Sequence, residues 1–221
     1  MIKNQKNNQH GFTIIELAIA TTVFSVLLLL SLGAIAQIGK MYYKGVTTAQ
    51  TQDVSRAVSN EIIQSIQLNA GTVSNTVTPP PGPGGTDSFC VGDTLYSYVI
   101  DRPMILNSST TQHVLWAETL ANCASVPHGP LTLTQAVPSV GTGGRELLSS
   151  NMRLSKLVVT QVGPASAQLY QVEIGIVYGD DDVLNPNDIP PDLKHTKCTG
   201  NFASAQFCAV VNLDTTVKKR I

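Results

Sequence analysis

Glu16 is the acidic side chain whose position most invites chemistry. It follows Gly11-Phe12-Thr13-Ile14-Ile15 and precedes an apolar run without charges from Leu17 to Gly39. A carboxylate at membrane depth costs about 2.5–3.5 kcal/mol even on lenient insertion scales. The positive end of a helix dipole returns only about 0.3–1 kcal/mol. We therefore expect Glu16 to pair with a positive charge that a neighbouring molecule supplies.

The segment Gly11-Phe12-Thr13-Ile14-Ile15-Glu16-Leu17 resembles the class III signal of type IV prepilins and pseudopilins. In that family a prepilin peptidase cuts after the glycine, methylates the new N-terminal amine and leaves the apolar segment on the protein. The resemblance implies cleavage between Gly11 and Phe12 and N-methylation of Phe12. It also implies an assembly contact between Glu16 and the Phe12 amine of a neighbouring subunit, a charge-assisted pairing.

The residues around the apolar run predict its topology. Met1 to His10 is polar and carries Lys3 and Lys6 but no acid, so it should stay in the cytoplasm. The 23 uncharged residues that follow Glu16 are enough to cross a membrane of about 30 Å. We expect a single pass through the inner (cytoplasmic) membrane and later residence in an extracytoplasmic pilus or pseudopilus. The predicted segments are a leader at 1–11, a transmembrane and filament-core helix at 12–39, an amphipathic continuation at 40–70 and an extracytoplasmic head at 71–221.

Two other interpretations of the apolar run stay open. Ala34-Ile35-Ala36 follows the run as an ordinary secretory cleavage site would, and cleavage there would start the chain at Gln37. Alternatively, the run is an uncut signal anchor with an incidental glutamate. Either would leave a secreted or membrane-anchored binding or adhesion domain instead of a filament subunit.

The helix is expected to continue beyond the membrane. Lys44 to Leu68 contains no proline, and apolar residues recur there at three- and four-residue spacing: Val46, Val54, Ala57, Val58, Ile62 and Ile66. The opposite face is expected to carry Gln52, Arg56, Ser59 and Gln67. Gly33, Gly39 and Gly45 are the positions where bending is expected.

The rest of the chain reads as loops and strands. The proline- and glycine-rich segment 78–85 predicts a loop. Strands are predicted at Thr94–Ile100, Val114–Thr119, Leu154–Val162, Gln168–Tyr178 and Gln206–Leu213. A helix followed by antiparallel strands gives an α+β fold. The same order, a long N-terminal helix packed on a small antiparallel sheet, is what the resemblance to pilins implies.

All four cysteines lie beyond the apolar run, at Cys90, Cys123, Cys198 and Cys208. Their even number fits disulfides in an oxidising compartment, and four cysteines allow three connectivities. We favour nearest-neighbour pairing, Cys90 with Cys123 and Cys198 with Cys208. A zinc site is disfavoured because no C-x-x-C pattern occurs.

One acidic segment could bind a metal ion. Its oxygen-bearing side chains suit Ca²⁺ and follow the fourth predicted strand: Asp180, Asp181, Asp182, Asn185, Asn187 and Asp188. The spacing does not match an EF-hand, and a solvated turn is the favoured alternative. No other cofactor is predicted.

The sequence does not predict an enzyme or a nucleic-acid-binding protein. The four histidines form no H-E-x-x-H or H-x-E pattern: His10, His113, His128 and His195. Ser139 lacks the first glycine of a nucleophile elbow, and Gly141-Thr142-Gly143-Gly144 lacks the lysine of a phosphate loop. The net charge is −1, and the basic end Lys218-Lys219-Arg220 is expected to be solvated. The only tryptophan, Trp116, is expected in the core.

These residues together predict a filament subunit that does no catalysis. Its expected partners are the prepilin peptidase, the membrane and other pilins or pseudopilins. The globular part is large for a major subunit, so we favour a minor pilin or minor pseudopilin.

Overall fold

The computed structural model describes residues 12–68, 73–74, 86–106, 112–120, 123, 144–186, 195–199 and 205–220. Contacts within the chain divide it into two units, Met1–Tyr42 and Tyr43–Ile221. The first unit contains the beginning of helix α1, and the second contains the remainder of α1 together with all the described strands.

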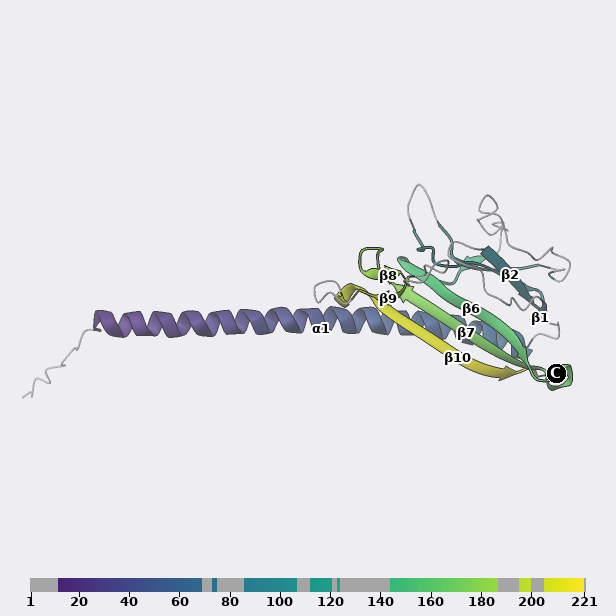
Figure 1. Cartoon of the computed structure of the whole chain (residues 1–221), viewed down its shortest axis with the longest axis horizontal. Coiled ribbons are helices and arrows are strands. Elements are labelled where there is room, and N and C mark those ends of the chain that lie inside the picture. Colours follow the sequence, from purple (N-terminus) through teal and green to yellow (C-terminus); the bar gives the residue numbers. More distant parts are fainter. Residues whose placement is uncertain are drawn as a thin grey trace, which may run out of the picture. The chain divides into compact units, whose positions relative to one another are not determined.

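Helix α1 runs from Ile14 to Leu68 (Figure 1), as the sequence predicts. Gly33, Gly39 and Gly45 lie inside it, and a Cβ atom at any of them would meet nothing within 4 Å. No close neighbour therefore requires glycine at these positions. The helix propagates through them because the residues around them are mostly good helix formers, without a proline.

The part of α1 in the second unit buries a stripe of small and branched side chains: Thr51, Ser55, Val58, Ser59, Ile62 and Ile66. Val58, Ile62 and Ile66 confirm part of the predicted apolar face, and Val54 is half-buried. The prediction is wrong for Val46 and Ala57, which are exposed. The prediction for Ser59 is wrong, because this side chain is buried instead of solvated. The hydroxyls of Thr51 and Ser55 donate to carbonyls four residues earlier, both at 2.8 Å, so short polar side chains can be buried without losing a hydrogen bond.

The first sheet is antiparallel and has the order β1-β2-β3-β4-β5. Its strands are β1 Val73–Ser74, β2 Thr86–Val91, β3 Thr94–Val99, β4 Leu115–Thr119 and β5 Arg145–Glu146. Strands β2 and β3 form a hairpin in which Val91 faces Thr94 across Gly92-Asp93. Gly92 has φ of 60°, a left-handed conformation that glycine adopts without strain.

The second sheet has the order β10-β7-β6, also antiparallel. It consists of β6 Met152–Val162, β7 Leu169–Tyr178 and β10 Ala209–Lys218, with the short pair β8 Leu184–Pro186 and β9 His195–Cys198 beside it (Figure 1). Two 3₁₀ turns, Ala165–Ala167 and Ala205–Phe207, precede β7 and β10. Gly175 in the central strand is required by close packing, because a Cβ there would lie 2.4 Å from Ser155 Oγ.

The main core joins the helix to both sheets. Val58, Ile62 and Ile66 of α1 share one buried cluster with residues of the first sheet, such as Tyr96, and of the second, such as Ile174. In β7 the alternating residues Tyr170, Val172, Ile174 and Ile176 are buried, as the period-two pattern predicts. A second, smaller cluster contains Val177, Val183, Leu184 and Cys208.

The fold is α+β, with one long helix packed on antiparallel sheets, which confirms the fold class that the sequence predicts. Four of the five predicted strands match β3, β4, β6 and β7 to within two residues. The fifth prediction, Gln206–Leu213, places the strand too early: β10 runs from Ala209 to Lys218. The prediction omits β2 and the short strands β1, β5, β8 and β9. Segment 78–85 lies outside the described residues.

Candidate assembly segment

A reciprocal contact between Thr13 and Glu16 closes the N-terminal end of α1. The Thr13 backbone N–H and hydroxyl both donate to Glu16 Oε2, at 2.9 and 2.8 Å, and the Glu16 N–H donates to Thr13 Oγ1 at 3.3 Å. This is the capping box Ser/Thr-x-x-Glu, which satisfies donors that lack a partner within the helix. The expectation that Glu16 relies wholly on a neighbouring molecule is therefore incomplete, because part of its hydrogen bonding is met within the chain.

Only one of the two Glu16 carboxylate oxygens takes part in the cap. Both Thr13 contacts end on Oε2, and no described residue contacts Oε1. Glu16 is exposed, and Phe12 beside it is 82% exposed. Gly11 lies outside the described residues, so cleavage between Gly11 and Phe12 stays a prediction. The geometry leaves Oε1 accessible to a cation from outside the chain.

The surface of α1 in the first unit is apolar and uncovered. Every residue from Phe12 to Ile38 is exposed, including large apolar side chains throughout. By length and composition α1 could cross a membrane, and none of its most apolar stretch is buried within the chain. Exposed apolar patches this extensive are rare on monomeric soluble proteins and are typical of surfaces that contact a membrane or another protein.

The hydroxyl groups within this apolar surface are satisfied by the helix itself. Thr21 and Thr22 donate to the Ala18 carbonyl at 3.0 and 3.1 Å, and Thr22 also reaches Ile19 O at 2.8 Å. Ser25 and Ser31 donate to carbonyls four residues earlier, both at 2.8 Å. In hydrocarbon an unsatisfied polar group costs several kcal/mol, so these bonds let the helix carry hydroxyls without a partner helix.

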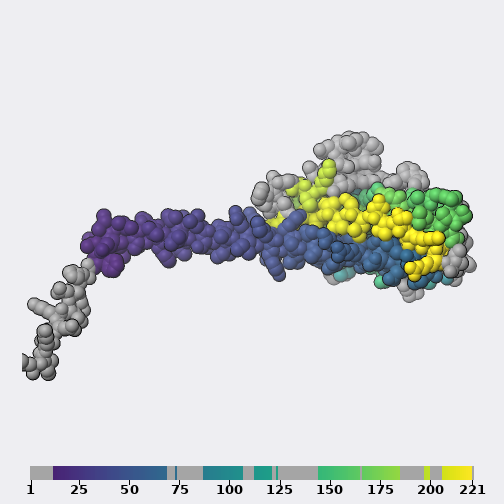
Figure 2. All heavy atoms as spheres, turned by 90° about the horizontal axis from the view of Figure 1, so that it is seen from below, coloured from purple at the N-terminus to yellow at the C-terminus, as the bar shows by residue number. Residues whose placement is uncertain are grey.

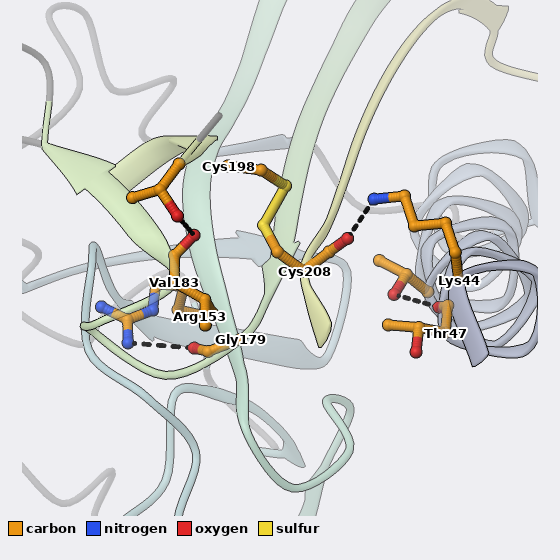
Figure 3. The surroundings of a disulfide bond; sticks show 9 residues. Lys44, Thr47, Arg153, Gly179, Val183, Cys198 and Cys208 are labelled. Atoms are coloured by element: carbon orange, nitrogen blue, oxygen red, sulfur yellow. Dashed lines mark hydrogen bonds between the residues drawn. A yellow bond between two sulfur atoms is a disulfide. The ribbon is translucent and has the colours of Figure 1, made fainter. Parts of the chain in front are cut away.

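In the second unit, the Cys198–Cys208 disulfide lies beside α1 (Figure 3). Lys44 Nζ donates a hydrogen bond to the Cys208 carbonyl, and the Tyr43 and Phe207 rings lie 6.4 Å apart. On the other side, the Thr199 N–H and hydroxyl donate to the Val183 carbonyl at 2.9 and 3.0 Å. The disulfide thus lies where β9, the start of β10 and α1 come together.

The other disulfide joins Cys90 of β2 to Cys123, and both residues are buried. Together the two bonds give the nearest-neighbour pairing favoured from the sequence, and no described cysteine is free. On a chain-entropy model, closing loops of these lengths stabilises the fold by about 3 kcal/mol each.

The acidic turn after β7 is held by a buried arginine. Arg153 is 2% exposed, and its Nη2 donates to the Gly179 carbonyl at 3.3 Å (Figure 3). The same atom donates to Asp181 Oδ1 at 2.6 Å. Arg153 Nη1 lies 3.6 Å from Oδ1 of Asp101, whose side chain is 5% exposed. Gly179 has φ of 139°, and a Cβ there would clash with Val183 at 2.8 Å, so the turn requires glycine.

This ion pair changes what the candidate calcium ligands can do. Asp180, Asp181 and Asp182 are exposed, but Asp181 is already paired with Arg153. Asn187 and Asp188 lie outside the described residues, as does the side chain of Asn185. Within the described residues no group of three His, Cys, Asp or Glu side chains is placed to hold a metal ion. Calcium binding therefore stays a prediction.

The Glu146 carboxylate binds three backbone N–H groups at and near the start of β4. It accepts from the backbone N–H groups of Val114 (2.8 Å), Leu115 (2.9 Å) and Leu148 (3.1 Å). His113 Nδ1 lies 3.3 Å from Glu146 Oε2, and the His113 ring packs edge-on against Trp116 at 4.5 Å. His113 thus lies in a structural cluster, and the prediction that Trp116 belongs to the core is confirmed at 6% exposure.

The remaining candidates are dispersed or undescribed. Lys218 and Arg220 are exposed, and the Arg220 N–H donates to the Gln67 carbonyl at 3.3 Å. His10, His128, Ser139 and the glycine-rich segment 141–143 lie outside the described residues. The absence of enzymatic activity and of nucleic-acid binding both stay predictions.

Three structurally important residues were missed at the sequence level. Thr13 could have been found, since Thr13-x-x-Glu16 before an apolar run is a sequence signature of a capping box. Arg153 and Glu146 could not, because their partners are distant in sequence or are backbone groups.

Comparison with known families identifies a motif in the N-terminal segment. The family model for the prokaryotic N-terminal methylation motif matches residues 6–32, which include Gly11, Phe12 and Glu16. Comparison with curated proteins and with solved structures finds no match.

Proposed function

We propose, from the premise that this chain carries a type IV prepilin-like class III signal, that it is a minor subunit of a type IV pilus or of a type II secretion-like pseudopilus. A prepilin peptidase would act on it between Gly11 and Phe12. The second unit is large for a repeating shaft subunit, which supports a minor position in the filament.

The uncovered apolar surface of the first unit carries this proposal. A helix with every residue exposed from Phe12 to Ile38 needs an apolar surrounding, and a membrane or a bundle of like helices both supply one. Its hydroxyls already have partners, so exchange between these surroundings leaves no hydroxyl unpaired.

Glu16 would supply the contact that sets the axial position of the subunit. Oε2 is engaged by Thr13, and Oε1 is accessible. The N-terminal amine of Phe12 in a neighbouring subunit could bind Oε1 without breaking the cap, and an ion pair shielded from water is stronger than one in solution. The cap would hold the carboxylate in position before the neighbour arrives.

Before assembly the protein would be anchored in the inner membrane with the second unit outside the cytoplasm. The two disulfides support this side, because such bonds persist in oxidising compartments. Lys3 and Lys6 ahead of the helix favour a cytoplasmic N-terminus.

The test compares Glu16→Gln with Glu16→Ala. Glutamine keeps an oxygen that can accept from Thr13 but carries no charge, whereas alanine removes both the cap and the charge. If charge pairing drives incorporation, both variants should be processed but should enter filaments at least about tenfold less than wild type. Normal incorporation of Glu16→Gln would refute the charge pairing.

Intact mass and N-terminal analysis of protein from membranes test the premise separately. A chain that starts at N-methylated Phe12 supports the prepilin interpretation. A start at Gln37 would indicate ordinary signal-peptidase cleavage, and an intact Met1 would indicate a signal anchor. Either result would overturn the proposed function.

A further inference from the structure

Strand β10 forms one edge of the second sheet. It pairs with β7 through ten consecutive residues, from Ala209 with Tyr178 to Lys218 with Leu169, without a bulge. Its other side has no neighbouring strand among the described residues. Proteins usually protect such edges with proline, bulges, charged side chains or a covering helix. Strand β10 has no proline and no bulge, carries the charged residues Asp214 and Lys218, and meets α1 just beyond each of its ends.

Hydrogen bonding at the end of β10 shows which backbone groups face outward. The Lys219 N–H donates to the Gln168 carbonyl at 3.0 Å, which continues the register of the ladder by one residue. In an antiparallel ladder, alternate residues bond to the same neighbour. The odd-numbered residues of β10 therefore face β7, and the even-numbered residues present their N–H and C=O groups to the outer edge.

Helix α1 uses the outward groups just beyond the two ends of the strand. The Cys208 carbonyl accepts from Lys44, and the Arg220 N–H donates to Gln67 O. Both residues are even-numbered, in agreement with the alternation. Figure 2 shows β10 (yellow) at the surface over its length, beside the second-unit part of α1 (blue).

Between these two contacts the outward backbone groups have no partner among the described residues: Val210, Asn212, Asp214, Thr216 and Lys218. A groove of about 290 Å³ lies along the first part of this edge. It is lined by Val210 to Leu213 on the strand and by Gln52 and Arg56 on the helix.

Arg56 gives the groove its charge. It is exposed, lies one turn of α1 after Gln52, and takes part in no ion pair among the described residues. Asp53 is also exposed but lies outside the groove lining. The groove therefore offers one cation, the side-chain amides of Gln52 and Asn212, and the outward backbone groups of Val210 and Asn212.

We propose that the outer edge of β10 is a docking site for an extended acidic segment of a partner protein. The segment would add as a further strand, with its backbone paired to the even-numbered residues from Val210 to Lys218 and a carboxylate on Arg56. Backbone pairing provides affinity in this mode of recognition, and the side-chain groove provides selectivity. The contacts of α1 with Cys208 and Arg220 limit the segment to about the length of β10.

The binding test uses the full-length protein in detergent micelles and a fluorescent synthetic peptide as long as β10 that alternates valine with glutamate. The matched control peptide alternates valine with lysine. The glutamate peptide should bind at least about tenfold more tightly than the lysine peptide, and Arg56→Glu should remove most of this difference. Equal binding of the two peptides would overturn the assignment of an acidic partner.

A matched pair of proline variants tests the edge itself. Thr216→Pro removes an outward N–H, whereas Thr215→Pro removes an N–H that bonds to β7, and both side chains are exposed. Thr216→Pro should keep the wild-type fold and weaken peptide binding about tenfold or more. Thr215→Pro should destabilise the sheet. Unchanged peptide binding by a folded Thr216→Pro variant would overturn the proposal.

Residue-resolved amide exchange gives a readout that does not depend on any substitution. Without peptide, the amides of Asn212, Asp214 and Thr216 should exchange faster than those of Val211, Leu213 and Thr215. The glutamate peptide should slow exchange in the even-numbered set alone. Slow exchange of that set without peptide, together with self-association, would overturn the proposal in favour of a second copy of the chain on the edge.

Discussion

The two parts of α1 differ in whether other residues of the same chain cover them. In the second unit the helix buries Val58, Ile62 and Ile66 against strands of its own chain. In the first unit the same helix exposes comparable side chains, such as Leu28 and Leu29, throughout its length. Regular backbone structure is common to both parts. The difference shows that α1 is stabilised by tertiary packing in one unit and is left uncovered by its own chain in the other.

Hydroxyl residues serve both parts by the same local bond. Ser25 and Ser31 in the first unit, and Thr51 and Ser55 in the second, donate to carbonyls of the preceding turn. In the first unit this bond satisfies the hydroxyls of an uncovered apolar surface. In the second unit it allows small side chains to be buried against the sheets. The same local hydrogen bond therefore satisfies hydroxyls both on the uncovered surface of the first unit and in the buried interface of the second.

The largest expected contrast is between core and uncovered apolar residues. Ile62→Ala should lower the free energy of unfolding of the second unit by about 2–5 kcal/mol, because it leaves a cavity at a fully buried position. Leu28→Ala, at a 47% exposed position of the first unit, should leave that free energy unchanged. Urea unfolding in micelles, followed by fluorescence of the buried Trp116, measures both. Equal losses would contradict the contrast.

Alkaline pH should act on the second unit through a buried tyrosine. Burial is the main cause that raises the pKa of Tyr96 to about 12, against a partly offsetting hydrogen bond with Ser65. The folded protein therefore keeps this proton where the unfolded chain loses it. The free energy of unfolding should not depend on ionisation of Tyr96 below pH of about 10. It should fall by about 2–3 kcal/mol as pH rises towards 12.

Unfolding titrations of Tyr96→Phe test this pH effect. The variant should show a shallower loss of stability above pH of about 10, and the residual slope should come from Tyr98, whose pKa burial also raises. Tyr42→Phe, at an exposed position of the first unit, is the control and should keep the wild-type slope. An unchanged slope in Tyr96→Phe would contradict the assignment.

Removal of the helix cap should affect the first unit alone. Thr13→Ala should destabilise the first turn of α1 by about 1 kcal/mol, while Thr13→Ser should retain the hydroxyl contacts with Glu16. Amide exchange of the first turn in micelles measures this loss. The unfolding midpoint of the second unit should not move, and a shift there would show that the two units are energetically coupled.

The smallest expected effect concerns a surface ion pair of the second unit. Arg145 Nη2 lies 2.8 Å from Glu61 Oε2 of α1, but the Arg145 side chain is 68% exposed. Arg145→Ala should therefore cost at most about 0.2–1 kcal/mol, and added salt should reduce the loss. A double-mutant cycle with Glu61→Gln measures the pair itself. A coupling well above this range would mean that the helix relies on charge as well as on apolar packing.

Local patterns in the sequence were sufficient for the helix and for most of the second sheet. The period of two in β7 and the absence of proline in α1 are local signals, and both structures follow them. Strand β2 was missed because Asp87 and Ser88 dilute its apolar pattern, although Gly92-Asp93 is a recognisable hairpin turn. The end of β10 was missed because Asp214 interrupts the apolar run. Its carboxylate accepts from Gln171 across the sheet, which no local pattern predicts.

The residues of the candidate site likewise fall into those that a local sequence pattern predicts and those that only the topology brings together. The signal around Gly11, Phe12 and Glu16 is contiguous in sequence and can be recognised without a structure. The pairing of Arg153 with Asp181 joins residues 28 positions apart, and the outward row of β10 depends on its register with β7. Such features come from topology, because only the sheet order decides which strand lies at an edge.

The self-contained hydrogen bonding of the first unit has a consequence for the energetics of assembly. In the proposed function, this helix moves from lipid into a bundle of similar helices, and both surroundings are apolar and dry. Since none of its hydroxyls has to change partner, the transfer should be nearly neutral in free energy. Lipid and filament would then compete for the subunit on almost equal terms. The direction of movement would be set by the pairing at Glu16 and by the work of the assembly machinery.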